Sequence, residues 1–444
     1  MNQALLLRFL KTVLPSMLAF TFSSLFVIVD GFFVGRNTGD VGLAAICIAF
    51  PAVALVQAVG TGLGMGGAIQ IAVCRGTKET DGELRFLGNT ILLLLGSGVL
   101  LTAALVVLAY PVLLLLGAEG ALLEPGLQYL RVAALGALFQ VCAQGFVPLL
   151  RNYDRSILAM GAMVTGFLMN ILLDWLLVEV WKYGLYGAAA ATAFSQMVTT
   201  IPCALFLFRK ARTMKRDHWK PRGGLVSQIV RVGLSPFGLS LSPNLVLLVM
   251  NRAALAYGGE VAVAAYAVIS YAITVVLYLL QGTGDGSQPL MSLYLGQGQP
   301  EKARQVRNLA YVLAFGASVL CLWLFWVGRD TVSILFGASP EAAAIVSRVM
   351  LYFSLGAVGL SFARVTTAYF YSIRENRYAY VLVYGEPVFL TLLLAAVLPP
   401  LWGLEGVWLA TPVAQFLLAG VSAILLRRHS RKERKAASAQ EGGV

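Results

Sequence analysis

Long apolar segments separated by short polar ones run along the whole chain. Between Arg85 and Glu119 there is no Asp, Glu, Lys or Arg, and this interval contains the run ILLLLGSGVLLTAALVV. The hydrocarbon core of a bilayer is about 30 Å thick, so a helix that crosses it needs about 20 apolar residues. The pattern therefore predicts an all-α integral membrane protein.

About twelve helical spans are predicted when apolar residues are followed in windows of about 20 residues. Several of these spans exceed the length that a bilayer needs, which implies that they tilt or extend beyond the lipid. The predicted spans are residues 12–35, 43–73, 86–116, 127–150, 157–180, 185–208, 227–256, 262–295, 306–336, 343–372, 379–400 and 404–427.

Composition agrees with a membrane protein and argues against an enzyme. Of the 444 residues, 59% are hydrophobic and 12% are charged, whereas a typical soluble protein has about 25% charged residues. The two histidines, His218 and His429, lie in basic segments, and none of the five cysteines belongs to a CxxC motif. A zinc site or a His-based catalytic centre is therefore not expected. Because the chain also has no GxxxxGK[ST] motif, we expect no cofactor, and transport must be driven by an ion gradient or a partner.

Positive charges divide the loops into two sets. The more cationic set contains Arg75, Lys78 and Arg85; Arg151 and Arg155; RKARTMKRDHWKPR at 209–222; Lys302, Arg304 and Arg307; and Arg374 and Arg377. The positive-inside rule places these loops in the cytoplasm, and an even number of spans places both termini there, in the inner (plasma) membrane. The net charge of +12 follows from this topology. Nucleic-acid binding would need a folded basic domain, which these scattered residues do not form.

The second half of the chain repeats features of the first. Residues 184–196 read GLYGAAAATAFSQ and residues 403–415 read GLEGVWLATPVAQ; residues 60–64 read GTGLG and residues 282–286 read GTGDG. Both pairs are offset by about 220 residues, which indicates an internal repeat. Each half would contain six spans, an even number, so the two halves are parallel repeats with one orientation.

This repeat predicts the domain organisation. We expect an N-terminal six-helix lobe at 1–208, a basic cytoplasmic linker at 209–226, a C-terminal six-helix lobe at 227–427 and a cytoplasmic tail at 428–444. Parallel repeats in transporters usually bind substrate in a cleft at their interface and work by rocking one half against the other. A cleft within one chain also favours a monomer.

These segments resemble the multidrug and toxic compound extrusion (MATE) family of transporters, in its prokaryotic form. The resemblance covers nearly the whole chain and rests on VDGFFVGRNTGDVGLAA, GTGLG, NILLDW and GLYGAAAATAFSQ with its C-terminal counterpart. It implies secondary active efflux of amphipathic, often cationic compounds in exchange for Na⁺ or H⁺, by alternating access. The wider superfamily also contains flippases, so a flippase of a lipid-linked precursor remains the alternative.

Polar residues inside the spans are the candidates for ion coupling. An aspartate at the centre of a membrane helix costs about 2.5–3.5 kcal/mol, which makes Asp30 a functional candidate. Asn170 and Asp174 are spaced i, i+4 and share one face of the fifth span, and Thr192 lies in the sixth. If these spans meet, two carboxylates, an amide oxygen and a hydroxyl surround one point. Such oxygens suit Na⁺, and paired carboxylates also suit a proton.

The family resemblance implies the same set. Asp30, Asn170, Asp174 and Thr192 match the cation site in the N-terminal half of prokaryotic members, although the match does not distinguish Na⁺ from H⁺. The alternative is that these side chains only join helices by hydrogen bonds, which contribute about 0.6 kcal/mol each in membrane proteins.

The C-terminal half has a different set of polar residues. Asn251 stands at the position related to Asp30, Arg252 follows it, and the tenth span contains Arg364 rather than an acid. A second cation site is therefore not predicted. The candidates for the substrate cavity are Asp285, Glu386, Asn251, Arg252 and Met291. An acidic or apolar cavity would favour drug export, whereas a basic one would favour the flippase.

Overall fold

The structure is a computed structural model that describes residues 3–335 and 339–441, and every described segment of regular structure is helical. Side chains are described for these residues except 27, 31, 32, 35, 39, 40, 43, 332–335 and 434–441. The helices are α1 Gln3–Thr77, α2 Thr80–Leu115, η1 Gly120–Leu122, α3 Leu123–Leu135, α4 Ala137–Asn152, α5 Ser156–Leu173, η2 Asp174–Val180, α6 Gly184–Ala211, η3 Arg216–Trp219, α7 Gly223–Gly296, α8 Pro300–Leu335, α9 Pro340–Ser372, α10 Asn376–Tyr384, η4 Gly385–Leu390 and α11 Thr391–Glu441. The all-α class predicted from the sequence is confirmed.

Within the described residues, nine helices are long and apolar enough to cross a membrane, or ten when α3 and α4, bent by 53° at their junction, count as one span. Two of the nine are much longer than a bilayer needs, and each contains a break at a glycine with positive φ, Gly259 in α7 and Gly403 in α11. Division at these breaks brings the total to twelve, the number that the sequence predicts. The breaks fall in the gaps predicted between spans 227–256 and 262–295 and between 379–400 and 404–427.

Two predicted segments extend beyond the described residues. The span 306–336 ends one residue past the described end of α8, and the tail 428–444 is described as part of α11 only up to Glu441. The division of the chain into two six-helix lobes stays a prediction. By contacts, the chain forms two compact units, Met1–Leu241 with Gln281–Val306, and Ser242–Leu280 with Arg307–Val444.

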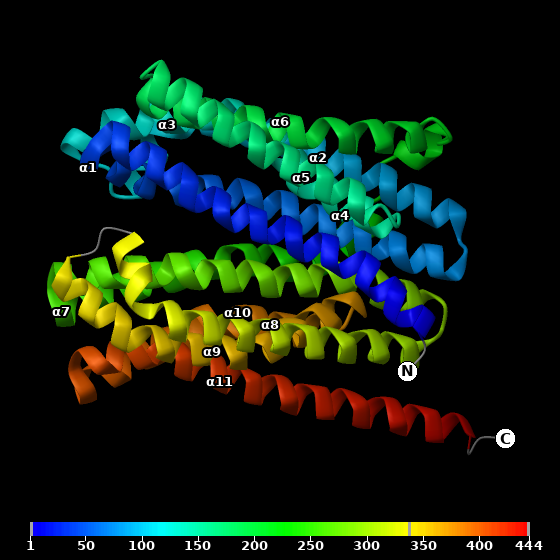
Figure 1. The fold of residues 1–444 in the computed structure, drawn as a ribbon. Coiled ribbons are helices and arrows are strands. Elements are labelled where there is room, and N and C mark those ends of the chain that lie inside the picture. The colour runs from blue at the N-terminus through cyan, green and yellow to red at the C-terminus, as the bar shows by residue number, and fades with distance from the viewer. Residues whose placement is uncertain (1–2, 336–338, 442–444) are drawn as a thin grey trace. The chain divides into compact units, whose positions relative to one another are not determined.

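In the first unit, α1 packs against α2, α4 and α5, and α6 packs against α4 and α5. Figure 1 shows α5 and α6 running alongside α1. Glycines of the GTGLG motif explain how α1 approaches α4 so closely. A Cβ on Gly60 would lie 2.7 Å from the carbonyl oxygen of Val141, and one on Gly64 would overlap the backbone of Gly145. A residue without a Cβ is required where backbones come this close.

In the second unit, α9 and α11 lie side by side (Figure 1). Its core contains Trp408, which is fully buried and stacks on Tyr266, and Tyr266 also contacts the ring of Phe353. Aromatic pairs of this kind add to the free energy of burial. Gly356 of α9 lies directly against Pro412 of α11, where a Cβ would be 2.8 Å from the Cα of the proline. The two helices therefore pack at short range.

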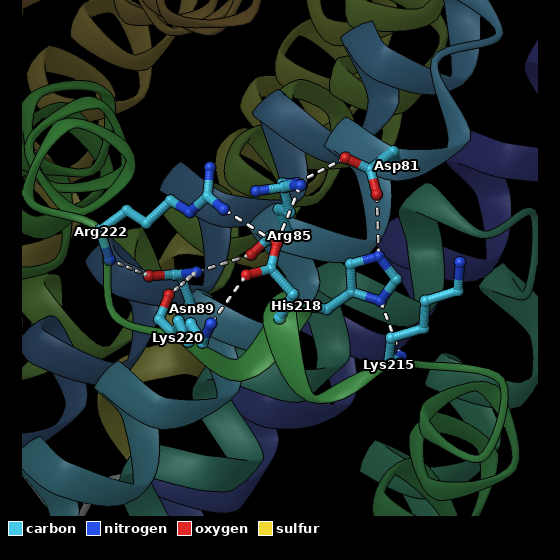
Figure 2. Close-up of polar contacts among 8 residues, drawn as sticks. Asp81, Arg85, Asn89, Lys215, His218, Lys220 and Arg222 are labelled. Atoms are coloured by element: carbon cyan, nitrogen blue, oxygen red, sulfur yellow. Dashed lines mark hydrogen bonds and ion pairs between the residues drawn. The ribbon is translucent and has the colours of Figure 1, made fainter.

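The basic linker is held against α2 in the first unit. Figure 2 shows Asp81 of α2 bonded to His218, with 2.9 Å between Oδ1 and Nε2, and Asn89 accepting from the backbone N–H of Arg222 at 3.1 Å. Arg85 of α2 forms an ion pair with Asp217 at 2.9 Å. The linker can approach because position 88 is glycine, where a Cβ would overlap the backbone of His218. The segment predicted as a basic cytoplasmic linker is thus docked on α2 by specific hydrogen bonds and ion pairs.

Candidate functional site

Two carboxylates from separate helices meet in the first unit. Asp30 lies in α1, and Asp174 begins η2, the π-helix that continues α5. The two carboxyl groups lie within hydrogen-bonding reach of each other, and Asp174 is fully buried. Two carboxylates this close repel one another unless a proton or a cation lies between them. The structure therefore brings together the two acids that the sequence predicts as partners.

Asn170 lies one helical turn before Asp174 and is also fully buried. Taken as carboxylates, neither acid can donate a hydrogen bond. In the part of the chain that the structure describes, both oxygens of Asp174, Oδ1 of Asp30 and both side-chain polar atoms of Asn170 have no partner. Buried polar atoms are almost always paired in folded proteins. These oxygens therefore offer ligands to a proton or to a hard cation such as Na⁺.

Thr192 is half-buried in α6 and lies on a helix packed tightly against α5. A Cβ on Gly166 of α5 would lie 2.9 Å from the carbonyl oxygen of Ser195, and the Ser195 hydroxyl donates to the Thr192 carbonyl at 2.7 Å. Among the described residues, no hydrogen bond joins the Thr192 hydroxyl to Asp30 or Asp174. Of the four predicted ligands, only Asp30 and Asp174 are shown in direct contact, and the roles of Asn170 and Thr192 as ligands stay predictions.

Tyr129 is a further candidate for this site, one that the sequence did not indicate. It lies in α3 and is 5% exposed, and the charges of both Asp30 and Asp174 act on its hydroxyl. Its phenol can donate a hydrogen bond to a carboxylate. The residue sits in an ordinary stretch of the fourth predicted span, with no polar partner at helical spacing, so only tertiary structure reveals its position.

A second contact joins the same two elements beyond the carboxylates. Asn37 in α1 donates to Glu179 in η2 at 2.6 Å and accepts from Lys182 at 2.8 Å. Arg36 adds an ion pair to Glu179 at 3.8 Å. Asp30 and Asn37 are two turns apart on α1, and both face η2. The first helix is therefore connected to the π-helix at two levels.

The π-helices themselves are unexpected. Their wider turns are rare, and they occur frequently at functional sites. η2 spans Asp174–Val180, and a second one, η4, spans Gly385–Leu390 in the predicted fifth span of the C-terminal half. Each contains a buried acid, Asp174 in η2 and Glu386 in η4.

The candidates for the substrate cavity lie in both units. In the first unit, Asp285 forms an ion pair with Arg151 of α4, with 4.0 Å between Oδ2 and Nη2. Both side chains are 4% exposed. Met291 is fully buried in the same segment of α7.

In the second unit, Glu386 is 6% exposed. It lies within hydrogen-bonding reach of Gln415 and within the electrostatic range of Arg364. Asn251 is half-buried and Arg252 is exposed, both on α7. The role of all five candidates as substrate contacts stays a prediction.

Within the described residues, no group of three or more His, Cys, Asp or Glu side chains is arranged to hold a metal ion. The Asp30–Asp174 pair with Asn170 is a smaller set of hard oxygen ligands. Such a set suits a monovalent cation or a proton, as predicted, better than a tightly held divalent metal.

Known proteins resemble this chain over most of its length. The MatE family model matches residues 15–176 and 239–395. The chain is 23% identical over 417 residues to the multidrug export protein MepA of Staphylococcus haemolyticus, covering 91% of this chain and 90% of MepA. It is 26% identical over 450 residues to an FAD transporter of Shewanella oneidensis, covering 97% and 96%.

The fold agrees as well. A solved outward-facing conformation of a multidrug resistance MATE family transporter of the MOP superfamily matches with a TM-score of 0.91 at 24% identity, over 96% of each chain. At this identity the likeness establishes the fold alone. The family model covers well over half of the chain, so the protein belongs to the MatE family and is a multi-pass membrane transporter rather than an enzyme.

Proposed function

We propose that this transporter exports amphipathic, often cationic compounds in exchange for Na⁺ or H⁺ that binds at Asp30 and Asp174. The observation that carries the proposal is the contact between these two carboxyl groups beside the unpartnered amide of Asn170. The similarity to proteins named multidrug export protein supports drug-like substrates.

The moving parts in this proposal are the two six-helix lobes, 1–208 and 227–427, joined by the linker 209–226. The chain works as a monomer in the plasma membrane with both termini in the cytoplasm. The cationic loops, which include 209–222, support this orientation. The repeated motifs support the two lobes.

Coupling follows from the repulsion between the two acids. Without a bound ion, the charges of Asp30 and Asp174 favour separation of α1 from η2. A proton or Na⁺ between them removes that repulsion and favours the closed contact. An ion changes the balance of two arrangements only if its affinity for them differs. The Asn37–Glu179 hydrogen bond, at 2.6 Å, keeps α1 aligned with η2 while the carboxylates change state.

Thr192 has a supporting role in this scheme. Its hydroxyl becomes a fourth ligand when α1 and α6 approach further, and α6 is already fixed to α5 through Gly166. A Na⁺ ion needs more oxygen ligands than a proton does. Thr192→Val should therefore impair transport more if the coupling ion is Na⁺ than if it is H⁺, and the size of the loss reports which ion is used.

Efflux of ethidium from cells lacking their own pumps tests the proposal. Wild type is compared with Asp30→Asn and Asp174→Asn, and Na⁺ and pH are varied separately. Glu119→Gln, which changes an exposed acid, is the matched control. We expect both Asn variants to lose efflux at normal expression while the control retains it. Efflux by Asp30→Asn with unchanged ion dependence would exclude this coupling site.

A second candidate function is export of a phosphate-bearing compound, including the flipping of a lipid-linked precursor. The observation that favours it is the fixed positive charge of Arg364, which is 7% exposed in α9. Its Nε and Nη1 have no hydrogen-bond partner in the described part of the chain. Gln415 of α11 and Arg364 both lie close to Glu386. Thr411 and Gln415 stand at positions repeat-related to Thr192 and Gln196. The likeness to an FAD transporter supports such substrates.

Uptake of FAD into inside-out vesicles distinguishes the two candidates. If the phosphate-bearing substrate is correct, wild type accumulates FAD and Arg364→Gln loses this activity. Lysine at position 364 would not be equivalent to arginine, because the guanidinium group offers phosphate more hydrogen-bond donors than an ammonium group does. If ethidium is exported and FAD is not, drug export stands alone.

A further inference from the structure

Glycines line a close contact between segments that belong to different predicted lobes. Gly62 and Gly66 of α1 lie against the first turns of α7. A Cβ on Gly62 would be 3.0 Å from the carbonyl oxygen of Gly233, and one on Gly66 would be 3.0 Å from the backbone nitrogen of the same residue. These glycines belong to the GTGLG region, which the coupling site does not use.

The second copy of the motif makes the reciprocal contact. Gly282 and Gly286 of GTGDG lie against the beginning of α1. A Cβ on Gly282 would be 2.8 Å from the Cα of Met17, and one on Gly286 would be 3.0 Å from the Cα of Val13. The second span thus contacts the seventh, and the eighth span contacts the first. The two contacts are related by the repeat.

Between them, Gly76 at the end of α1 meets Gly296 at the end of α7. A Cβ on Gly76 would lie 2.7 Å from the Cα of Gly296. These two glycines are themselves separated by about 220 residues, the repeat offset. Their contact therefore joins repeat-related positions of the two predicted lobes, at the end predicted to face the cytoplasm.

Polar side chains reinforce this contact at the same end. Asn152, the last residue of α4, donates from Nδ2 to Oε1 of Gln288 at 2.9 Å, and Nε2 of Gln288 donates back to Oδ1 of Asn152 at 3.2 Å. Gln288 also donates to Ser292 at 2.9 Å. Asn152 is 2% exposed and Gln288 is fully buried. A reciprocal pair of amides is directional, so it fixes one register between α4 and α7.

Charged groups surround the amide pair. Arg151 pairs with Asp285 at 4.0 Å, one turn along α7 from Gln288. Arg75 of α1 donates to the carbonyl oxygen of Asn152 and forms an ion pair with Asp154 at 2.7 Å. The Arg151–Asp285 pair joins the first predicted lobe to residues 281–296 of the second, whereas the Arg75 interactions hold the end of α1 against the end of α4 within the first lobe. All of them lie within the first compact unit.

We propose that the Asn152–Gln288 amide pair and the Arg151–Asp285 ion pair hold the cytoplasmic end of the transporter closed. We call these two pairs the latch. The glycine-lined contact lets the helix backbones meet without interlocking side chains, so they can also separate. The amides set the register of the closed state, and a neutral pair can exchange its partner for water when the cytoplasmic end opens. The latch rests on transport by two lobes, but it does not depend on the coupling ion or the substrate.

Distance measurement between spin labels tests the latch without any transport assay. Labels at Arg155 and Gln297, both exposed and near the latch, report the separation of α4 from the end of α7. In otherwise wild-type protein with native cysteines replaced, we expect one short distance. Asn152→Ala with Gln288→Ala should add a second, longer distance. Gln140→Ala, a buried amide of α4 away from the latch, is the matched control and should change nothing.

Reversible cross-linking gives the functional test. A short bis-methanethiosulfonate reagent joins cysteines introduced at Asn152 and Gln288, because the side-chain contact leaves the two backbones too far apart for a direct disulfide. We expect loss of efflux on cross-linking and recovery with reductant. The control links Arg85→Cys to Asp217→Cys, between α2 and the linker within the first compact unit, and should retain efflux.

The outcomes separate the latch from the proposed function. If wild-type protein exports none of the compounds tested, the transport proposal fails, and the spin-label distances still decide the latch. An unchanged distance distribution in Asn152→Ala with Gln288→Ala, or full efflux by the cross-linked protein, would overturn the latch.

Discussion

Asp285 lies 4.0 Å from Arg151, and each side chain is 4% exposed. The acid stands in the GTGDG motif, where the sequence predicts either a substrate contact or an ion pair with Arg252 or Arg364. Its observed partner is a different arginine, at the end of α4, and a contact with substrate stays a prediction. A buried charge is tolerated in a membrane protein when an opposite charge neutralises it, so the pair itself explains why an acid is kept at this position.

Removal of one partner should therefore destabilise the protein strongly. Asp285→Asn keeps the shape of the side chain but leaves the charge of Arg151 without its carboxylate, at a cost of about 3–5 kcal/mol. The double variant Asp285→Leu with Arg151→Met should be closer to wild type, because no charge remains buried. Thermal unfolding in detergent checks this order. Equal melting temperatures for the single and double variants would contradict it.

Glycine 64 should not tolerate even a methyl group. A Cβ there would overlap the backbone of Gly145 in α4, so Gly64→Ala must push the helices apart, at a cost of about 1–3 kcal/mol. Gly161→Ala in α5 is the control, since a Cβ there meets nothing within 4 Å. That variant should be neutral or slightly stabilised through helix propensity. Thermal unfolding of both variants measures the difference.

Most spans could be predicted from the sequence because a bilayer demands long apolar helices. The gap predicted between spans 12–35 and 43–73 is not seen as a break, since α1 is helical from Gln3 to Thr77. The gaps around Gly259 and Gly403 fall where the apolar runs pause, and the chain breaks there. The π-helices at 174–180 and 385–390 could not be predicted. A π turn results from how a helix is packed against its neighbours, and no residue type specifies it.

The candidate site, like the helices, could be predicted only in part from the sequence. Asn170 and Asp174 share a helix face, which spacing reveals, and the resemblance paired them with Asp30. Tyr129 and Arg151 reach their partners from other helices, and no periodicity connects positions so far apart in the chain. The GTGLG and GTGDG motifs were recognised as repeats, but their role in close helix contact becomes visible only from the backbone distances.

Docking of the linker on α2 should be lost when Gly88 is replaced by a residue with a side chain. Gly88→Val places methyl groups where the backbone of His218 lies, so segment 209–222 cannot dock. Trypsin should then cut this Lys- and Arg-rich segment faster than in wild type. Gly96→Val, on the same helix with open space around it, is the control and should be cut at the wild-type rate.

Docking of the linker should also depend on pH through Asp217. A hydrogen bond from Lys220 and the charges of Arg222 and Arg85 lower the pKa of Asp217 from its ordinary value of 3.8. The ionised form is favoured when the linker is docked, so its contribution is present above pH 3.8 and is lost as the pH falls through the lowered pKa.

Hydrogen exchange of segment 209–222, corrected for the intrinsic effect of pH on exchange, measures this loss. Asp217→Asn should be less protected at neutral pH and should lose less of its protection on acidification. Equal loss of protection in wild type and Asp217→Asn would assign the pH dependence to other groups.

Tyr129 provides a further test of the ion site, because both Asp30 and Asp174 act electrostatically on its hydroxyl. Tyr129→Phe keeps the ring that packs in the core and removes only the hydroxyl. A group that supports the ligands of an ion in this way typically changes its affinity by about tenfold or more. We therefore expect half-maximal efflux to require about tenfold more Na⁺, or a correspondingly lower pH, with the same range of exported compounds. Tyr110→Phe, which alters an exposed tyrosine of α2, is the control, and an ion dependence of Tyr129→Phe identical to this control would remove Tyr129 from the site.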